Sequence, residues 1–483
     1  MEAGQTADAK ALMEDVGEAG KVIIQHANAG NLILAASHID ADGIAAAGII
    51  GKSLFRLGAY FHIKILKQID ENLLKELSEE EAPLYILTDL GSGYLDIMKN
   101  SFPRSDVVVL DHHQTVGEPF PKLTQVNPHL QGFNGASEIS GAGVAYLVAK
   151  NINEENIDLS PLAIVGALGD LQDKNKKREL HGLNEIIVKD ATSSGHLKTE
   201  SDLIFYGRET RPIHLALSHT TNPFIPGLSG EEDKCLGFLI NIGISLKKNE
   251  KWRTLTDLST DEKQKIFSEL TAHMIAKGLS SDAALSLIGE VYTLTDEDRW
   301  TPLRDGREYA SVLNSCGRMD KGGLGVSICM GSRGPTMDEA QGILAEYRRT
   351  LAQYMELLTG TPDRIKEMEA IYVVRGEGLI DEKMLGSVSS ILTTTGLFKS
   401  EKPVIAFTMG DDGEIKFSAR ETQTLVNQGI NLGSIMQKTA EKFSGRGGGH
   451  DVAAGAQVPK GHEIEFLNQV NSTVKEQMRR VIE

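Results

Sequence analysis

The sequence has few of the residues that stabilise secreted or membrane-spanning proteins. Its 483 residues include only three cysteines, which lack the spacing of metal ligands and are too few for a disulfide framework. No apolar run approaches the roughly 18 residues that a membrane span needs, and the first residues show no apolar signal core. We therefore expect a cytoplasmic protein that makes no contact with a membrane.

Positive charge is also scarce. Lys and Arg number 50 against 67 Asp and Glu, so the formal net charge is −17. Such a surface favours solubility and argues against nonspecific binding of nucleic acid over the whole protein. A polynucleotide ligand would need a local basic track, helix N-termini or metal ions.

The first part of the chain alternates between apolar runs and amphipathic segments. We predict strands at 32–36, 61–66, 84–87 and 107–110, and helices at 1–30, 44–57, 70–80, 94–100, 141–150 and 161–169. Strands and helices that alternate at this spacing predict an α/β fold, with a doubly wound parallel sheet covered by helices on both faces. The functional crevice of such a sheet lies at the carboxyl ends of its strands.

The pattern changes beyond residue 195. Residues 196–300 lack alternating strands and are predicted to be mostly helical, and residues 334–360 have the spacing of a long exposed helix. The last part reads as a small α/β domain, with a strand at 371–374, a hairpin at 404–408 and 415–418, and a helix at 432–443. The length permits two to four domains, and we predict boundaries that give 1–195, 196–364 and 365–483.

Aspartate and histidine side chains follow the predicted strands. His38, Asp40 and Asp42 come after the first strand, Asp89 after the third, Asp111, His112 and His113 after the fourth, and Asp170 ends the helix near residue 165. Each residue alone would be an ordinary turn, cap or surface residue. Because the carboxyl ends of parallel strands meet at one edge, however, we expect these side chains to converge. Carboxylates so close together repel one another unless a cation lies between them.

The donor set indicates which metal this would be. Carboxylates with a minority of imidazoles and no thiolate suit Mn²⁺ or Mg²⁺ better than structural zinc. Four carboxylates and at least two imidazoles exceed the needs of one ion, so we expect two divalent cations, roughly 3.5–4 Å apart and bridged by one carboxylate. Such a pair activates water and stabilises an in-line phosphoryl displacement, which predicts phosphoester hydrolysis.

These motifs resemble the four motifs of the DHH phosphoesterase superfamily, and Asn127-Pro128 also looks like that family. The segments 447–450 and 453–455 resemble the DHH-associated substrate domain. The length and the stretches 221–227 and 313–318 look like archaeal RecJ-like exonucleases, a group that includes the GINS-associated nuclease. The resemblance spans nearly the whole chain.

The resemblance implies a role for each site residue. His38, Asp40 and Asp89 would hold one ion, and Asp42, Asp89, His112 and Asp170 would hold the second, with Asp89 as the bridge. The resemblance places His113 at the scissile phosphate, and Asp111 would orient the histidines as a hydrogen-bond acceptor. None of these positions is missing, which separates the chain from the replisome scaffold of the same superfamily.

A second group of candidates would bind the substrate. Gly447, Gly448 and Gly449 let backbone N–H groups approach a phosphate closely, although a flexible linker would read the same way. His450 follows them, and residues 451–455 are predicted to open a helix whose N-terminus favours an anion. Arg420, at a strand end, is predicted to clamp a phosphate, with a surface salt bridge as the alternative.

Two further basic sites are candidates. Lys176 and Lys177 lie in a basic run just after Asp170 and would track a nucleic-acid backbone, unless the run is only a solvated loop. Arg318 could serve likewise, although the residues around it have no chemical signature of their own.

We therefore predict a two-metal phosphodiesterase that removes nucleotides from the end of single-stranded DNA or RNA. A nanoRNase or a cyclic-dinucleotide or pyrophosphate hydrolase of the same superfamily is the first rival, but such proteins are usually compact and this chain has a long middle segment. A scaffold that binds GINS or another replication or RNA-processing factor is the second rival, and the intact ligand set argues against it.

Overall fold

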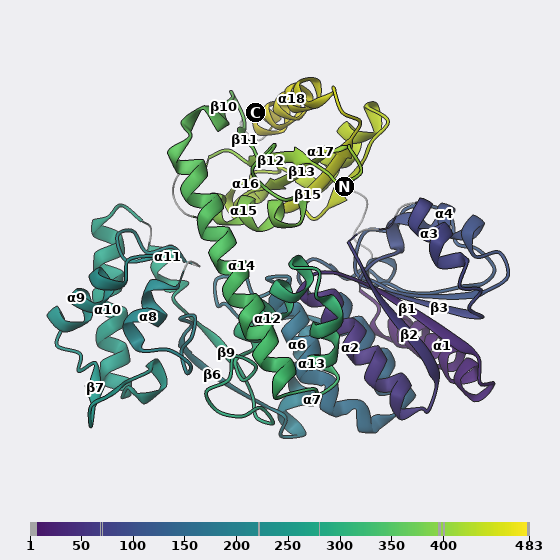
Figure 1. Cartoon of the computed structure of the whole chain (residues 1–483), viewed down its shortest axis with the longest axis horizontal. Helices are drawn as coiled ribbons and strands as arrows, with labels where there is room; N and C mark the ends of the chain where they lie inside the picture. Colours follow the sequence, from purple (N-terminus) through teal and green to yellow (C-terminus); the bar gives the residue numbers. More distant parts are fainter. Residues whose placement is uncertain are drawn as a thin grey trace. The chain divides into compact units, whose positions relative to one another are not determined.

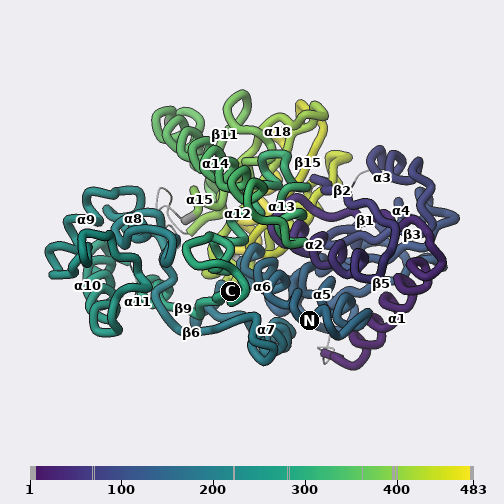
Figure 2. Tube along the Cα trace, turned by 60° about the horizontal axis from the view of Figure 1, so that its bottom comes forward, coloured from purple at the N-terminus to yellow at the C-terminus, as the bar shows by residue number. Residues whose placement is uncertain are grey.

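The computed structural model describes residues 7–67, 69, 71–220, 223–279, 281–394, 398 and 401–480 (Figures 1 and 2). Of the residues used in the predictions above, 1–6, Asp70, Thr221 and Asn222 lie outside this set. The chain divides into two compact units, Met1–Leu344 and Ala345–Glu483. The boundary falls inside helix α14 (Pro335–Gly360), which is the predicted long helix. The further division at residues 195 and 364 stays a prediction.

Unit 1 is built on a five-stranded parallel sheet with the order β2-β1-β3-β4-β5. Its strands are β1 (Leu32–His38), β2 (Tyr60–Leu66), β3 (Leu84–Thr88), β4 (Asp106–Leu110) and β5 (Leu123–Val126). The predicted parallel sheet is confirmed, and β5 is a fifth strand that the sequence did not reveal. From β1 the chain adds β2 on one side of the sheet and then β3, β4 and β5 on the other side, so the order of the strands reverses between β1 and β3. The crevice of such a fold is expected at the carboxyl ends of these two strands.

Helices cover both faces of this sheet, as a doubly wound fold requires. One face packs against α1 (Ala9–Asn28), α2 (Ala41–Arg56) and α5 (Gly141–Ile152), and the other against α3 (Glu71–Ser78) and α4 (Leu95–Ser101). Successive residues of β1 alternate between the two cores: Ile33 and Ala35 belong to the first, and Leu34 and Ala36 to the second. Burial on both sides explains why these strands are continuously apolar.

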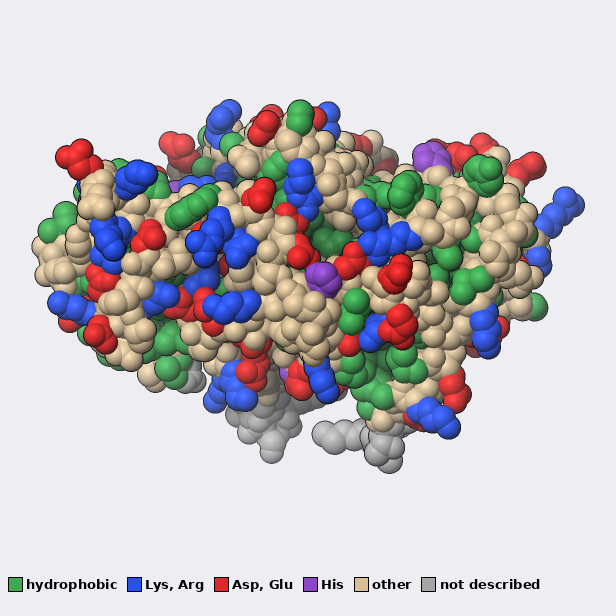
Figure 3. All heavy atoms as spheres, turned by 90° about the horizontal axis from the view of Figure 1, so that it is seen from below, with side chains coloured by type: hydrophobic (Ala, Val, Ile, Leu, Met, Phe, Trp, Pro, Cys, Tyr) green, Lys and Arg blue, Asp and Glu red, His purple; other side chains and the backbone are tan. Residues whose placement is uncertain are grey.

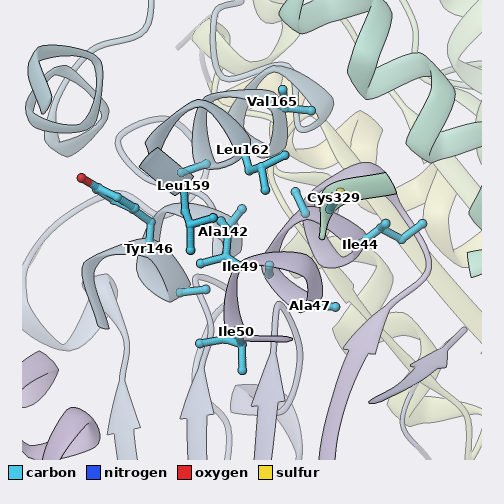
Figure 4. Packing of buried hydrophobic residues seen from close by; sticks show 14 of the residues in the cluster. Ile44, Ala47, Ile49, Ile50, Ala142, Tyr146, Leu159, Leu162, Val165 and Cys329 are labelled. Atoms are coloured by element: carbon cyan, nitrogen blue, oxygen red, sulfur yellow. The ribbon is translucent and has the colours of Figure 1, made fainter. Parts of the chain in front are cut away.

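The larger core extends outward from α2. This helix packs against α5 and α6 (Ser160–Gly169), and Figure 4 shows Ile49 and Ile50 of α2 among Ala142, Leu159 and Leu162. Helices α12 (Gly306–Arg318) and α13 (Gly322–Cys329) join the same core, where Cys329 lies close to Ile44 (Figure 4). The helix α7 (Leu183–Ser193) packs against α6.

The middle segment of unit 1 forms a helical lobe, which Figures 1 and 2 both show, and this lobe has its own core. Its helices are α8 (Ile213–Ser218), α9 (Glu232–Asn241), α10 (Thr260–Ala276) and α11 (Ser281–Leu285). The predicted absence of strands is wrong at both ends, because β6 (Leu197–Leu203) pairs antiparallel with β9 (Ile288–Leu294). The strand β6 is mostly polar, with only its terminal leucines buried, so it lacks the apolar run that marks the other strands.

Unit 2 contains a six-stranded sheet with the order β10-β11-β12-β13-β15-β14. Its strands are β10 (Ile365–Glu367), β11 (Tyr372–Arg375), β12 (Val404–Met409), β13 (Ile415–Arg420), β14 (Arg446–Gly449) and β15 (Ala453–Val458). Its helices after α14 are α15 (Glu382–Thr394), α16 (Gln423–Asn427), α17 (Leu432–Lys442) and α18 (Glu463–Arg480). The predicted hairpin of β12 and β13 is confirmed. Among the described residues of the chain, none of the helices is both long and apolar enough to cross a bilayer.

The predicted helix at residues 451–455 is wrong. The glycine run forms β14, and Ala453–Val458 forms β15, which pairs with both β14 and β13. Small residues allow either a helix or a strand, and pairing with β13 selects the strand here. The helix-N-terminus argument for anion binding after His450 therefore fails.

Candidate metal centre

The carboxyl ends of β1, β3 and β4 bring the predicted ligands of unit 1 together. His38 ends β1, Asp89 follows β3 directly, and His112 lies two residues beyond the end of β4. Potential ligand atoms of His38, Asp40 and Asp89 lie within 4.8 Å of one another, as do those of Asp42, His112 and Asp170. The ends of two helices complete the centre, since Asp42 is in the first turn of α2 and Asp170 follows α6.

Asp89 lies between the two groups. Its side chain is 2% exposed, and neither carboxylate oxygen accepts a hydrogen bond from a described residue. Oδ2 lies 3.7 Å from His38 Nδ1, and Oδ1 lies 3.1 Å from His112 Nε2. Its φ is +57°, a left-handed conformation that aspartate tolerates better than most residues and that is enriched at functional sites. A buried carboxylate with no donor is costly, and a bound cation would remove that cost.

The first group lies on the loop between β1 and α2. His38 Nδ1 is 2.8 Å from Asp40 Oδ2, while Asp40 Oδ1 accepts a hydrogen bond from Gly43 N at 3.1 Å. Asp40 is therefore the N-cap of α2 as well as a candidate ligand. This double role fixes one carboxylate oxygen on the helix and leaves the other facing the imidazole.

The second group is centred on His112, whose side chain is fully buried. Its Nε2 lies 3.3 Å from Asp170 Oδ2 and 3.7 Å from Asp42 Oδ2. Its Nδ1 lies 2.7 Å from the carbonyl oxygen of Gly135, which can only accept, so Nδ1 carries a proton and Nε2 faces the carboxylates. The Asp42 carboxylate also accepts hydrogen bonds from the N-terminal amides of α5, Gly141 N at 2.6 Å and Ala142 N at 3.0 Å.

The protonation of these groups follows from burial and crowding. Burial, and next the charge of Asp89, raise the pKa of Asp42 to about 7. Burial and the charge of Asp42 likewise raise the pKa of Asp170 well above its ordinary value. Burial alone would lower the pKa of His112, but the surrounding carboxylates outweigh it and raise that pKa. Without a metal, protons thus neutralise a centre that attracts positive charge.

Asp111 orients the next histidine. Its Oδ1 accepts a hydrogen bond from His113 Nδ1 at 2.8 Å and from two backbone amides, and its Oδ2 accepts one from Ser92 N at 2.8 Å. Burial opposes the charge of Asp111, but His113 outweighs it, so the pKa of this carboxyl lies well below its ordinary value. The sequence suggested that Asp111 orients both histidines, whereas the ring of His112 is held by Gly135.

Helix α12 supports the loop between β1 and α2, and residues of the 313–318 stretch make the contacts. Asn314 Oδ1 accepts a hydrogen bond from Ala41 N at 2.9 Å. A Cβ atom on Gly317 would lie 1.6 Å from the carbonyl oxygen of Ile39, so only glycine allows this approach. Burial would raise the pKa of the Asp40 carboxyl, but the charge and the hydrogen bond of His38 lower it. Arg318 is close enough to lower the same pKa further.

Two glycines make room for the carboxylates, and no sequence motif marked either of them. A Cβ on Gly141 would lie 2.6 Å from Asp89 Cβ, and one on Gly166 would lie 2.2 Å from Asp42 Oδ1. The alternation of glycine and alanine in these helices could have suggested close packing, but not against which residue.

The donor set fits a divalent cation. Aspartate oxygens and imidazole nitrogens from four separate segments of the chain converge, and the Asp89 oxygens have no other donor among the described residues. Hard oxygen ligands with some imidazole suit Mn²⁺ and Mg²⁺.

The predicted basic track near Asp170 is only partly on the surface. Lys176 and Lys177 are exposed, and Lys177 pairs with Glu179 at 3.0 Å. Arg178, from the same run, is buried beside Asp173, which also binds Arg307 at 2.6 Å. The run is therefore divided between three exposed lysines, Lys174 among them, and a buried ion cluster.

The substrate candidates of unit 2 lie around β13 and β14. Arg420 ends β13, and its Nε donates to Ser390 Oγ of α15 at 3.0 Å. Gly447 packs so closely on α17 that a Cβ would lie 2.6 Å from the carbonyl oxygen of Met436, and Gly449 has a φ of +127°. A Cβ on Gly448, by contrast, would meet no atom within 4 Å. His450 is half-buried and donates its backbone N–H to Ala453 O at 2.9 Å. The run is thus an ordered strand and not a linker.

Glu421, directly after Arg420, is a buried carboxylate that sequence reasoning missed. It is 7% exposed, and neither of its oxygens has a hydrogen-bond partner among the described residues. Burial, and next the charge of Asp451, raise its pKa from 4.5 to about 8. The folded protein therefore holds this proton more tightly than the unfolded chain does.

Glu421 should make unit 2 less stable as the pH rises. Below about pH 4.5 the Glu421 carboxyl is protonated in both the folded and the unfolded protein. Between there and about pH 8 only the folded protein keeps the proton, so the free energy of unfolding falls by at most roughly 1.4 kcal/mol per pH unit. Glu421→Gln removes this dependence, so thermal melting from pH 5 to 9 should show a shallower decline in the variant than in the wild type. Glu441→Gln, at an exposed position on α17, is the matched control and should follow the wild type. Parallel curves for Glu421→Gln and wild type would contradict the argument.

Comparison with known proteins identifies the family. Residues 205–288 match the DHH-CID domain and residues 370–476 match the DHHA1 domain. An uncharacterized protein of Methanocaldococcus jannaschii is 32% identical over 452 residues, which cover 92% of this chain and 93% of that protein. The chain therefore belongs to the DHH superfamily of phosphoesterases, as a RecJ-like member.

Two further proteins share the fold. The single-stranded-DNA-specific exonuclease RecJ of Thermus thermophilus is 28% identical over 194 residues, which cover 38% of this chain and 26% of RecJ. Its crystal structure with Mn²⁺ matches at a TM-score of 0.57 with 19% identity, covering 96% of this chain and 55% of RecJ. The chain thus spans about half of that RecJ structure. The crystal structure of CDC45 from Entamoeba histolytica matches at a TM-score of 0.62 with 11% identity, covering 96% and 99% of the two chains.

Proposed function

We propose that this protein is a two-metal phosphodiesterase that removes nucleotides from single-stranded DNA or RNA, in replication, repair or RNA processing. The observation that carries the proposal is Asp89, a buried carboxylate with no hydrogen-bond donor between two groups of further ligands. A single ion would use only part of this donor set, whereas a bridging carboxylate uses both oxygens. Mn²⁺ and Mg²⁺ are the proposed ions.

His38, Asp40 and Asp89 would hold one ion. The remaining ligands, Asp42, His112 and Asp170, would hold the other together with Asp89. Two divalent cations supply Lewis-acid activation of a phosphodiester and of the attacking water.

Residues around the ligands would position the substrate. Asp111 fixes the ring of His113, which is 38% exposed and thus accessible to a phosphate. Arg318 would add positive charge beside Asp40, and Lys176 and Lys177 would contact the backbone of the strand. In unit 2, we propose that Arg420, His450 and the backbone of residues 447–449 bind the nucleotide being removed.

The glycine run allows a test that separates folding from binding. Gly447→Ala should destabilise unit 2 by about 1–3 kcal/mol, because its Cβ would overlap the backbone of α17. Gly448→Ala should leave the melting temperature unchanged, since its Cβ enters open space, but should weaken oligonucleotide binding. Thermal melting and fluorescence anisotropy with a labelled oligonucleotide measure the two effects. Unchanged affinity in a well-folded Gly448→Ala variant would argue against substrate contact at this strand.

The name of the Thermus relative supports single-stranded DNA as a substrate class. That similarity covers only 38% of this chain, so preference for DNA or RNA and the direction of cleavage need a direct assay. End-labelled single-stranded DNA and RNA should be shortened stepwise in the presence of Mn²⁺ and left intact in EDTA. A dinucleotide, a cyclic dinucleotide and pyrophosphate belong in the same assay. Cleavage of these small substrates alone would replace the exonuclease with a small-substrate hydrolase.

A scaffold role that involves GINS or another replication factor is the second hypothesis. The fold shared with CDC45 along nearly the full length of both chains favours it. The intact ligand set favours an enzyme, and the two roles are compatible. A protein that binds no Mn²⁺ and degrades no oligonucleotide would leave the scaffold as the better proposal.

A further inference from the structure

Positive charge on this protein is mostly scattered. The net charge is −17, and over the face in Figure 3 the Lys and Arg side chains are interspersed with Asp and Glu. One short hairpin in the helical lobe of unit 1 differs. Its strands β7 (Lys247–Lys248) and β8 (Lys251–Trp252) place three lysines and a tryptophan within six residues. We call residues 247–252 the lysine hairpin.

The three lysines of this hairpin carry unneutralised charge. Lys247, Lys248 and Lys251 are exposed and form no ion pair with a residue that the structure describes. The only acidic side chain of the hairpin, Glu250, lies at its turn. Such a local excess is what an acidic protein needs to attract a polyanion.

The lysine hairpin has a tight turn. Lys247 pairs with Trp252 and Lys248 with Lys251, and the turn residues Asn249 and Glu250 have φ values of +50° and +63°. Two successive left-handed residues form the tight turn that matches the twist of a hairpin.

Arg253 anchors the base of the hairpin on α10. Its guanidinium donates to Glu262 through two hydrogen bonds of 2.6 and 2.7 Å and to the carbonyl oxygens of Ser245 and Asp257. These contacts hold the backbone at the base of the hairpin on α10.

Trp252 adds an aromatic surface. It is 44% exposed, with Lys247 Nζ 4.5 Å from its ring centre and the ring of His214 at 4.8 Å. The exposed indole offers a stacking surface for a base, which would take the place of the Lys247 ammonium group over the ring, and the lysines offer cations for phosphates. A duplex hides its bases from such a surface.

We propose that the lysine hairpin is a second binding site for single-stranded nucleic acid, in which the lysines contact phosphates and a base packs against Trp252. The site deepens the proposed function, because it would hold a part of the strand away from the metal centre. Binding there needs no metal and no cleavage, so it can be tested apart from activity.

The test uses the fluorescence of Trp252. The chain has two tryptophans, so Trp300→Phe leaves Trp252 as the sole reporter. Single-stranded oligonucleotide titrated into the full-length protein in EDTA should change this fluorescence, and affinity should fall with salt. Lys248→Gln with Lys251→Gln should weaken binding about tenfold and reduce the slope of log K against log salt by roughly 1.4, at about 0.7 per phosphate contact. Lys189→Gln, an exposed lysine on α7, is the control and should behave as the parent.

Three outcomes would overturn the proposal. The first is an oligonucleotide that binds without changing Trp252 fluorescence, and the second is an unchanged salt slope in the double variant. The third is a response to polyglutamate but not to the oligonucleotide, which would assign the hairpin to an acidic protein segment. Failure here would leave a metal-dependent nuclease activity intact, while a wild-type protein that cleaves no oligonucleotide could still bind one at the hairpin in EDTA, so the two proposals fail separately.

Discussion

Asp89→Asn is expected to lower the rate of Mn²⁺-dependent cleavage of oligonucleotides by roughly a thousandfold or more. This loss corresponds to about 4 kcal/mol of transition-state stabilisation. An amide has lost the negative charge and one of the two acceptor oxygens with which a carboxylate bridges two ions. Asparagine is the sharper substitution than alanine, because it tolerates the left-handed backbone at φ +57° while alanine would add strain. Isothermal titration with Mn²⁺ should show the number of bound ions fall.

For the stability of the metal-free protein, the expected effect of Asp89→Asn is the opposite, a gain. In the metal-free protein, the Asp89 carboxylate is buried and its charge acts on the nearby carboxylates of Asp42 and Asp170. Replacing it with a neutral group of the same size should raise the melting temperature in EDTA and reduce the further rise on adding Mn²⁺. Asp298→Asn, in an exposed loop of unit 1, is the matched control. Wild-type activity and Mn²⁺ stoichiometry in Asp89→Asn would refute the bridging role.

Gly317→Ala is expected to cost more than about 3 kcal/mol of stability and to weaken Mn²⁺ binding. Alanine favours a helix interior over glycine by about 1 kcal/mol, so propensity alone predicts stabilisation. The new methyl group would lie 1.6 Å from the Ile39 carbonyl oxygen, however, and two backbone segments must separate to admit it. The segment displaced is the loop that carries His38 and Asp40.

A glycine on the neighbouring helix provides the control. A Cβ on Gly323, in α13, meets no atom within 4 Å, so Gly323→Ala should be neutral or slightly stabilising. Urea denaturation and Mn²⁺ titration of both variants measure the contrast. If Gly317→Ala unfolds and binds Mn²⁺ as Gly323→Ala does, then α12 does not support the loop of His38 and Asp40 in the way proposed.

The features of the chain that could be predicted are those encoded over a few neighbouring residues. The strands β1, β3 and β4 are mostly apolar runs, and each is followed closely by candidate ligands. Since parallel strands end at a common edge, the meeting of His38, Asp89 and His112 follows from the fold class alone. The spacing of His38 and Asp40 likewise anticipates their contact, which measures 2.8 Å.

The features that could not be predicted depend on partners distant in sequence. The contact between His112 and Gly135 involves a backbone carbonyl, which no residue type marks. The strand β6 is polar and becomes a strand because β9 pairs with it some 90 residues later. Residues 453–458 suit a helix or a strand by composition, and only the pairing with β13 decides between them.

The helical lobe is connected through α12 to the loop between β1 and α2, which carries His38 and Asp40. At the start of this helix, Glu308 accepts a hydrogen bond from Thr210 at 3.0 Å, and one turn before its end Asn314 holds Ala41. Glu308 is only 3% exposed. Excising residues 205–288 to make a compact protein would remove Thr210 and leave this carboxylate without that donor, in the helix that supports His38 and Asp40. Residues 205–288 therefore contribute to the environment of the helix that holds this loop, and a shortened chain should keep the contact between Thr210 and Glu308.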